Sequence, residues 1–210
     1  QKNFTYLREA CIYHENIQIK EHPISREGLV EQTPHFRIEC AFLDHGVPTL
    51  GYRIQEVDQI KFDAKKLAAK GVFGPMVRKL EQEKVINING KKIRVDEVSW
   101  QEQGASFAYL LDTRDCPSAR RLANGADLIL AESTYLQEHI NLAQKYMHMT
   151  ATDAAKIAKD SGAQMLVLTH FSARYRDVSF FEKEAKIIFP TTYAAEDFSR
   201  YSFPARKKML

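Results

Sequence analysis

Histidine and carboxylate side chains recur at the ends of short apolar segments in this 210-residue chain. One segment ends in Asp44 and His45, and three others end in Asp112, Glu132 and His170. Taken alone, each is more often a turn or hydrogen-bonding residue than a ligand. Together they are the imidazole and carboxylate groups that a zinc site needs, including a carboxylate able to bridge two ions.

The number of these ligands limits what they can bind. A zinc ion takes about four ligands, so His45, Asp112 and His170 could hold one ion or half-fill a two-ion site. The sequence contains no H-x-H-x-D-H or H-E-x-x-H cluster to supply the rest. We therefore expect the isolated chain to hold zinc weakly or not at all.

The stretch 148–175 indicates how the fold positions two of the histidines. Thr150 and Asp153 form an approximate capping box, which predicts a helix directly after His148. The all-apolar run 165–168 predicts a strand covered on both faces, with His170 at its carboxyl end. A helix that leads into a buried strand is half of an α/β unit, and polar residues at such strand ends often face a ligand.

Apolar patterns elsewhere predict the elements that carry the other polar groups. A hairpin with His45 at its tip joins segments 35–43 and 51–54, and alternation at 12–19 is compatible with a further strand. Strands at 107–111 and 128–130 lead to Asp112 and Glu132. Helices are expected at 119–123 and 180–188, and 191–198 is expected to close the core. The pattern is that of an α/β fold.

The segment 57–95 differs in character, with ten basic and four acidic residues. Asp63 can cap a short helix, a second charged helix runs to Glu83, and Asn89 and Gly90 are typical of a tight hairpin. Few bulky apolar residues flank this hairpin, so part of the segment should project from the core. Lysines at this density more often form a solvated helical face than an arm that follows phosphates, so the sequence pattern alone favours the solvated face.

Composition indicates one ordinary soluble globular domain over 1–210, with 44% hydrophobic and 27% charged residues. The sequence has neither a membrane-length apolar run nor a secretory pattern. Its three cysteines, Cys11, Cys40 and Cys116, are scattered and suit a reducing cytoplasm. A net charge of +3 is weak support for a polyanionic partner.

Five blocks resemble ribonuclease Z, the family of tRNA 3′-processing endonucleases in the metallo-β-lactamase superfamily. They are F-L-D-H-G-V-P-T-L-G-Y-R-I (42–54), L-D-T-R (111–114), A-D-L-I-L-A-E-S-T-Y (126–135), H-M-T-A-T-D-A-A (148–155) and L-T-H-F-S-A-R-Y (168–175). The blocks follow the family's order and cover nearly the whole chain. F-G-P-M-V at 73–77 adds to the match within the basic segment.

This resemblance implies the αββα sandwich of the superfamily, present here without its N-terminal part. The family's H-x-H-x-D-H motif is expected before Gln1, and 57–95 is expected to be an inserted exosite arm that grips tRNA. Leu111 and Ala131 depart from the family, which commonly has glycine and histidine at these positions.

The same resemblance implies a role for each site residue. His45 would bind the first of two zinc ions, Asp112 would bridge them, and His170 would bind the second. His148 would contact the scissile phosphate and protonate the leaving oxygen, with Glu132 orienting it. Substrate contacts are expected from Arg174, Tyr175, Gly74, Pro75, Lys65, Lys66, Arg78 and Lys79.

The implied function is a cytoplasmic, zinc-dependent endoribonuclease that removes 3′ trailers from precursor tRNA by attack of a metal-activated hydroxide. The family precedent is a homodimer, and no membrane is involved. Two alternatives are a related phosphodiesterase with another substrate and a non-catalytic RNA-binding relative. The isolated chain is expected to have negligible nuclease activity.

Overall fold

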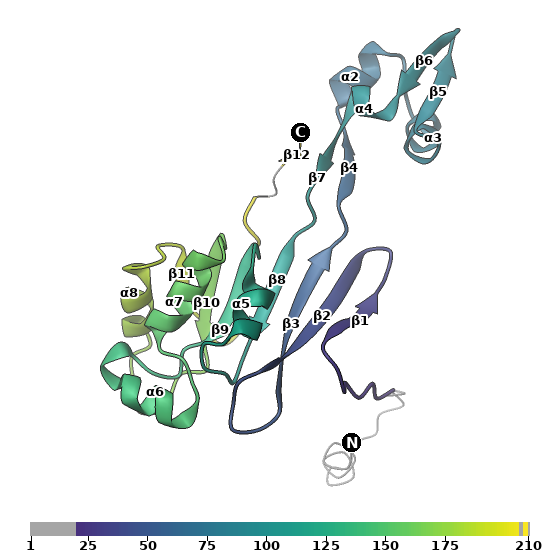
Figure 1. Cartoon of the computed structure of the whole chain (residues 1–210). Helices are drawn as coiled ribbons and strands as arrows, with labels where there is room; N and C mark the ends of the chain where they lie inside the picture. The colour runs from purple at the N-terminus through teal and green to yellow at the C-terminus, as the bar shows by residue number, and fades with distance from the viewer. Residues whose placement is uncertain (1–19, 206–207, 210) are drawn as a thin grey trace, which may run out of the picture.

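The computed structural model describes residues 20–205 and 208–209, so the expected strand at 12–19 and Cys11 lie outside it. Seven strands form one mixed sheet in the order β1-β2-β3-β8-β9-β10-β11 (Figure 1). Their bounds are β1 (Gly28–Gln32), β2 (Phe36–Leu43), β3 (Thr49–Glu56), β8 (Ser106–Leu110), β9 (Leu128–Glu132), β10 (Met165–Thr169) and β11 (Thr192–Ala194).

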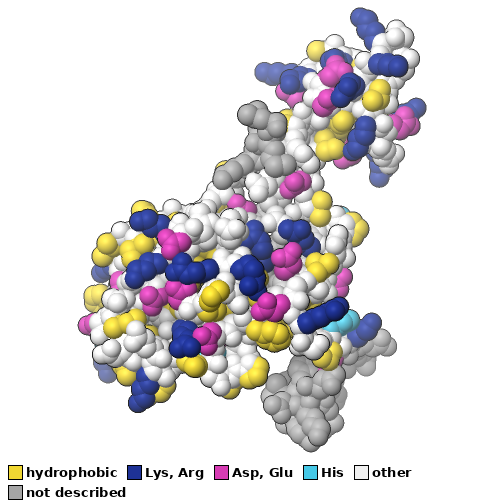
Figure 2. Space-filling view, viewed as in Figure 1, with side chains coloured by type: hydrophobic (Ala, Val, Ile, Leu, Met, Phe, Trp, Pro, Cys, Tyr) yellow, Lys and Arg dark blue, Asp and Glu magenta, His cyan; other side chains and the backbone are white. Residues whose placement is uncertain are grey.

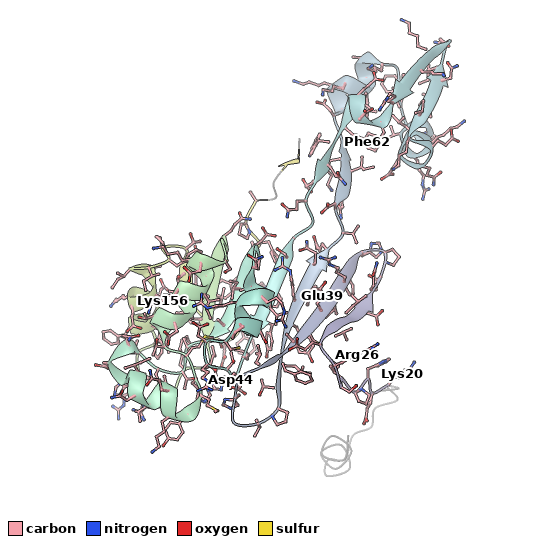
Figure 3. The ribbon with its side chains drawn as sticks, in the orientation of Figure 1. Lys20, Arg26, Glu39, Asp44, Phe62 and Lys156 are labelled. Carbon is pink, nitrogen blue, oxygen red and sulfur yellow. The ribbon has the colours of Figure 1, made fainter. Side chains whose placement is uncertain are left out.

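The strand directions bring the candidate site residues to one edge of the sheet. β1, β2, β3 and β8 pair antiparallel in that order, whereas β8, β9, β10 and β11 pair parallel. The carboxyl ends of β8, β9 and β10 therefore meet the turn between β2 and β3. Asp44, labelled in Figure 3, lies at this edge, where its carboxylate accepts from Arg114 Nε at 2.7 Å.

Helices cover one face of the sheet (Figure 1). They are α5 (Pro117–Ala123), α7 (Ala151–Asp160) and α8 (Ser179–Lys186), while η1 (Gln137–His139) and α6 (Ile140–Tyr146) lie near the edge where the parallel strands end. The small side chains of Ala154, Ala155 and Ala158 are fully buried, so α7 packs closely on β9 and β10. Phe181 of α8 is fully buried in the same core, and such burial stabilises the fold by about 1.5–3 kcal/mol.

The opposite face of the sheet is also apolar. Ile54, Phe107 and Leu130 line a hollow of about 440 Å³ there, to which Tyr201 and Phe203 of the C-terminal segment contribute. The predicted α/β class is confirmed. Of the expected two-sheet sandwich, the described residues outside the segment between β3 and β8 form the seven-stranded sheet, with helices on one of its faces.

The residues between β3 and β8 form an arm that projects from the far end of the sheet (Figure 1). Its stalk is the antiparallel pair β4 (Gln59–Phe62) and β7 (Ser99–Glu102), joined on β7 by β12 (Lys208–Met209). Its head contains α2 (Ala64–Ala69), α3 (Pro75–Glu83), β5 (Val85–Ile88), β6 (Lys91–Arg94) and α4 (Val95–Val98). Phe62, labelled in Figure 3, marks the join between the stalk and the head.

The head has its own small core, formed by Leu67, Val72, Leu80, Ile86, Ile93 and Val98. The expected caps and turns hold it together. Asp63 accepts hydrogen bonds from the backbone of Lys65 and Lys66, and Asn89 and Gly90 both have positive φ in the β5–β6 turn. Gly104 sits where the arm rejoins the sheet, and a Cβ there would lie 2.1 Å from the Glu56 carbonyl oxygen, so only glycine fits.

The predicted strands and helices are confirmed within the described residues, apart from their exact ends. One expectation is wrong. Thr192 is buried, but Phe198 is fully exposed at a positive φ, so 191–198 closes the core only through its first residues. The helices within 20–205 are all too short or too polar to cross a membrane.

Candidate metal and catalytic site

Four of the predicted site residues converge where the parallel strands end. Asp112, Glu132, His148 and His170 each offer a ligand atom, and these atoms all lie within 4.8 Å of one another. Asp112 follows β8, Glu132 ends β9, His170 follows β10, and His148 precedes α7. The structure thus brings together residues that are up to 58 positions apart in the sequence.

Asp112 and His170 form the most exposed part of this cluster. Asp112 Oδ1 lies 2.9 Å from His170 Nε2. Both residues have positive φ, 50° for Asp112 and 59° for His170, which is unfavourable for side-chain-bearing residues. The surrounding structure therefore holds both backbones in the left-handed conformation just after their strands end.

Glu132 is the buried centre of the cluster, with no exposed surface. Its Oε1 accepts a short hydrogen bond from the backbone N–H of Thr113, and its Oε2 accepts one from Met149 N at 3.1 Å. The Thr134 hydroxyl donates to Oε2 at 2.7 Å, and His148 Nδ1 lies 3.0 Å from both oxygens. A carboxylate satisfied on both oxygens orients its neighbours and is poorly placed to bind a metal itself.

His148 is held by this carboxylate. The hydrogen bond from Nδ1 to Glu132 raises the pKa of His148 above its usual value, although burial of the ring opposes the change. The charges of Glu132 and Asp112 act in the same direction as the hydrogen bond. The Nδ1 proton is engaged with Glu132, so Nε2 is the nitrogen left to exchange a proton with a bound molecule.

His170 is held by Thr134. The Thr134 hydroxyl oxygen lies 2.8 Å from His170 Nδ1, and the rings of His148 and His170 are 5.3 Å apart. Thr134 was not among the residues that sequence patterns singled out. Its position two residues after Glu132, within the block 126–135 that resembles ribonuclease Z, was an indication that it lies near the site.

His45 lies beside the cluster but is not one of its four members. Its ring is 4.9 Å from that of His148, and its Nδ1 donates to the Met147 carbonyl oxygen at 3.2 Å. This bond places the proton of a neutral ring on Nδ1 and leaves a lone pair on Nε2. A neutral His45 ring therefore presents the Nε2 lone pair that a metal ligand requires.

The chemistry of Asp112 and His170 fits a divalent metal. Asp112 Oδ1 is buried and makes no hydrogen bond of normal geometry within the described structure, despite its proximity to His170 Nε2. A buried carboxylate oxygen without a donor, opposite an imidazole nitrogen, is an arrangement that a cation relieves. The described residues therefore provide part of the ligand set of a metal site.

Arg174 and Tyr175 were both expected beside the site, and the structure separates them. Arg174 stacks over Tyr135, with Cζ 5.2 Å from the ring centroid, and Tyr135 in turn lies 6.3 Å from the His148 ring. The Tyr175 hydroxyl accepts from Leu136 N at 3.1 Å and lies 2.8 Å from His139 Nδ1. Arg174 therefore borders the site, whereas the Tyr175 hydroxyl is already engaged with Leu136 and His139.

An open hollow of about 560 Å³ adjoins the histidines. Its walls are Val47 in the β2–β3 turn, Tyr135, and the segment of Lys145 and Tyr146 that ends α6. Val47 and Tyr146 are largely exposed, and Lys145 Nζ lies 5.2 Å from the Tyr146 ring centroid. Apolar, aromatic and cationic groups therefore flank His45 and His148 on one side.

The predicted arm residues lie far from this cluster. Lys65 and Lys66 are on α2, and Gly74, Pro75, Arg78 and Lys79 are at the start and on the outer surface of α3. All six are exposed. Basic side chains are spread over the head in Figure 2, and Lys65, Lys66 and Arg78 form no ion pair with other described residues. Lys79 has only a distant one, 3.9 Å to Glu83.

Known proteins resemble this chain in sequence. A model of the β-lactamase superfamily domain matches residues 82–171. Ribonuclease Z of Protochlamydia amoebophila is 46% identical over 203 residues, covering 97% of this chain and 66% of that protein. Ribonuclease Z of Chlamydia muridarum is 48% identical over 204 residues, covering 97% of this chain and 67% of that protein. The chain thus spans about two thirds of the length of these curated relatives.

Solved structures share the fold. The short form of human tRNase Z matches with a TM-score of 0.52 at 22% identity, over 85% of this chain and 48% of that one. The metallo-β-lactamase fold protein YhfI from Bacillus subtilis matches with a TM-score of 0.50 at 19% identity, over 79% of this chain and 48% of that one. With its sequence relatives and its fold in agreement, the chain belongs to the ribonuclease Z family of metallo-β-lactamase-fold proteins.

Proposed function

We propose that this chain provides the proton-donating part of the active site of an endoribonuclease that removes 3′ trailers from precursor tRNA. The observation that carries the proposal is the contact between buried Glu132 and His148, beside the Asp112–His170 pair. The name of the curated relatives, ribonuclease Z, supports the reaction class.

The proposed cofactor is a pair of zinc ions held by His45, Asp112 and His170 together with ligands from the rest of the protein. When bound, zinc supplies a nucleophile at neutral pH and neutralises charge on the phosphate. The orphaned Asp112 Oδ1 and the free Nε2 of His45 support these ligand assignments.

His148 is proposed to protonate the leaving ribose oxygen. Its raised pKa makes the imidazolium form more abundant than it is for an ordinary histidine, and in that form Nδ1 donates to Glu132 and Nε2 carries the transferable proton. Glu132 stabilises that cation and keeps the ring in place. Arg174, stacked over Tyr135 beside His148, is proposed to contact a phosphate, and Tyr175 is proposed to contact a ribose.

The segment 57–95 is proposed to be an exosite arm that binds the tRNA body. Basic residues outnumber acidic ones ten to four within 57–95, and Lys65, Lys66 and Arg78 form no ion pair with other described residues. The exposed residues Lys65, Lys66, Gly74, Pro75, Arg78 and Lys79 are the proposed contacts. Contacts to phosphates provide binding affinity that does not depend on the nucleotide sequence.

We propose that the working unit is a cytoplasmic homodimer. The arm leaves the sheet at the end opposite to the site residues (Figure 1). An arm directed away from its own site is better placed to hold RNA that is cut by a second copy. The free, buried thiols of Cys40 and Cys116 are compatible with a reducing compartment.

The test compares two substrates in the whole protein with its metal. Replacing Lys65, Lys66 and Arg78 with alanine should reduce precursor tRNA cleavage at least ten-fold and leave hydrolysis of bis(p-nitrophenyl) phosphate unchanged. The matched control replaces Lys156, Lys159 and Lys183, exposed lysines on α7 and α8, and should alter neither rate. Unchanged tRNA cleavage in the arm variant would contradict the exosite assignment. If the unaltered protein left the 3′ trailer attached, the assignment of precursor tRNA as its substrate would be contradicted.

A further inference from the structure

We infer that Thr134 is a positioning residue that sets the tautomer of His170 and links it to the carboxylate that holds His148. The inference depends on the proposed function only for its catalytic consequence, because the hydrogen bonds can be tested without RNA or metal. Thr134 is 6% exposed and Glu132 is 0% exposed, so bulk water does not compete for their bonds.

The direction of the first bond follows from the surroundings of Glu132. Backbone N–H groups of Thr113 and Met149 donate to its two oxygens, and His148 Nδ1 lies within hydrogen-bond distance of both. A carboxylate so surrounded acts as an acceptor. The Thr134 hydroxyl, 2.7 Å from Oε2, is therefore the donor in this contact.

The direction of the second bond follows from the first. A threonine hydroxyl has one proton, and once that proton points to Glu132 the oxygen can only accept at its other contacts. His170 Nδ1, 2.8 Å away, must then carry a proton and donate it to Thr134. A neutral His170 ring is accordingly protonated on Nδ1 and bare on Nε2.

This tautomer explains why Asp112 Oδ1, on the other side of the His170 ring, receives no hydrogen bond from it. The unprotonated Nε2 faces Asp112 Oδ1 at 2.9 Å, and that oxygen makes no normal hydrogen bond within the described structure. Two acceptors face each other at this distance, an arrangement that a cation between them would stabilise. Thr134 thereby prepares the Nε2 lone pair of His170 as a ligand.

One buried carboxylate then controls both histidines. It orients His148 directly, and it orients His170 through the hydroxyl of Thr134. Displacement of Glu132 would therefore disturb both histidines, whereas displacement of Thr134 would act first on His170.

The experiment measures the His170 tautomer by long-range ¹H–¹⁵N NMR correlations in the metal-free protein, near pH 8.5 so that most imidazoles are neutral. Signals of His170 are assigned by their loss in His170→Asn. The unaltered protein and Thr134→Ser should show the Nδ1-protonated form. Thr134→Val, which keeps the shape but removes the hydroxyl, should shift His170 toward the Nε2-protonated form.

A second readout is the affinity for Co²⁺ or Zn²⁺ without substrate. Thr134→Val should weaken binding about 10–100-fold, as is typical when a partner of a metal-binding histidine is lost, whereas Thr134→Ser should remain within about three-fold. Thr192→Val is the matched control, since Thr192 is equally buried but donates to the Phe189 carbonyl away from the site.

Two results would overturn the inference. One is an Nε2-protonated His170 in the unaltered protein, and the other is a Thr134→Val variant with unchanged tautomer and metal affinity. If the tautomer is as inferred but precursor tRNA is not cut, the inference stands and the proposed function fails.

Discussion

Replacing Glu132 with glutamine should strongly destabilise the fold, even though the two side chains have nearly the same shape. Glutamine puts an NH₂ group where one carboxylate oxygen stood. Whichever oxygen is replaced, a buried backbone N–H, from Thr113 or Met149, then faces another donor. Each buried donor left without an acceptor costs about 1–3 kcal/mol, and loss of the charge-assisted bond to His148 costs about 1.5–3 kcal/mol.

The expected loss is therefore about 3–6 kcal/mol, a large part of the ~5–15 kcal/mol that stabilises a typical domain. Urea unfolding followed by circular dichroism at neutral pH measures it. Glu138→Gln is the control, because Glu138 is well exposed and should change stability by less than about 0.5 kcal/mol. A loss below about 1 kcal/mol for Glu132→Gln would refute the view that this carboxylate organises the site.

Three further predictions concern pH, salt and the hollow. Because the folded pKa of His148 is raised, its contact with Glu132 should stabilise the metal-free protein fully below the unfolded pKa of about 6.5 and lose this effect as pH rises through the higher folded pKa. As the pH rises from 6 to 9, the free energy of unfolding of the unaltered protein in urea should thus fall relative to that of His148→Asn. A difference that stays constant with pH would contradict the raised pKa of His148. Alanine at Lys65 and at Lys66 should each reduce the slope of log affinity for tRNA against log salt by about 1, and an unchanged slope would argue against phosphate contacts. Tyr146→Ala should weaken precursor tRNA binding by about 1–3 kcal/mol if a base stacks in the hollow beside His148, without altering hydrolysis of a small diester; equal affinity would exclude that stacking.

Features set by neighbouring residues were predictable from the sequence. Thr150 and Asp153 form the expected reciprocal cap, and Asn89 and Gly90 form the expected turn. Both depend on contacts within a few positions, so the residue types suffice. The convergence of Asp112 and His170 was also predictable, because parallel strands bring their carboxyl ends to one edge.

Features set by packing between distant segments were not predictable from residue types. Thr134 bridges Glu132 and His170, whose spacing depends on how β9 and β10 pair. Tyr175 follows Arg174 directly, yet its hydroxyl bonds to His139 and Leu136 because its ring packs against Phe181. Phe198 is exposed because the chain leaves β11 after Ala194.

The function of the arm was only partly predictable from the sequence. Its basic residues were visible in the sequence, but lysine density alone favoured a solvated surface over a nucleic-acid contact. The structure adds that the head has a separate core under its basic surface and stands away from the sheet (Figure 2). A projecting, independently packed basic element is more typical of a binding module than of a surface that is merely solvated.

The most direct test of the central claim is to map the ends of the products when the whole protein, supplied with zinc, acts on a precursor tRNA that carries a 3′ trailer. We predict one cut that releases the trailer, and a rate that falls about 10²–10⁴-fold in His148→Ala while RNA binding is kept. A protein that leaves the trailer attached, or a His148→Ala variant that cuts as fast as the unaltered protein, would contradict the account.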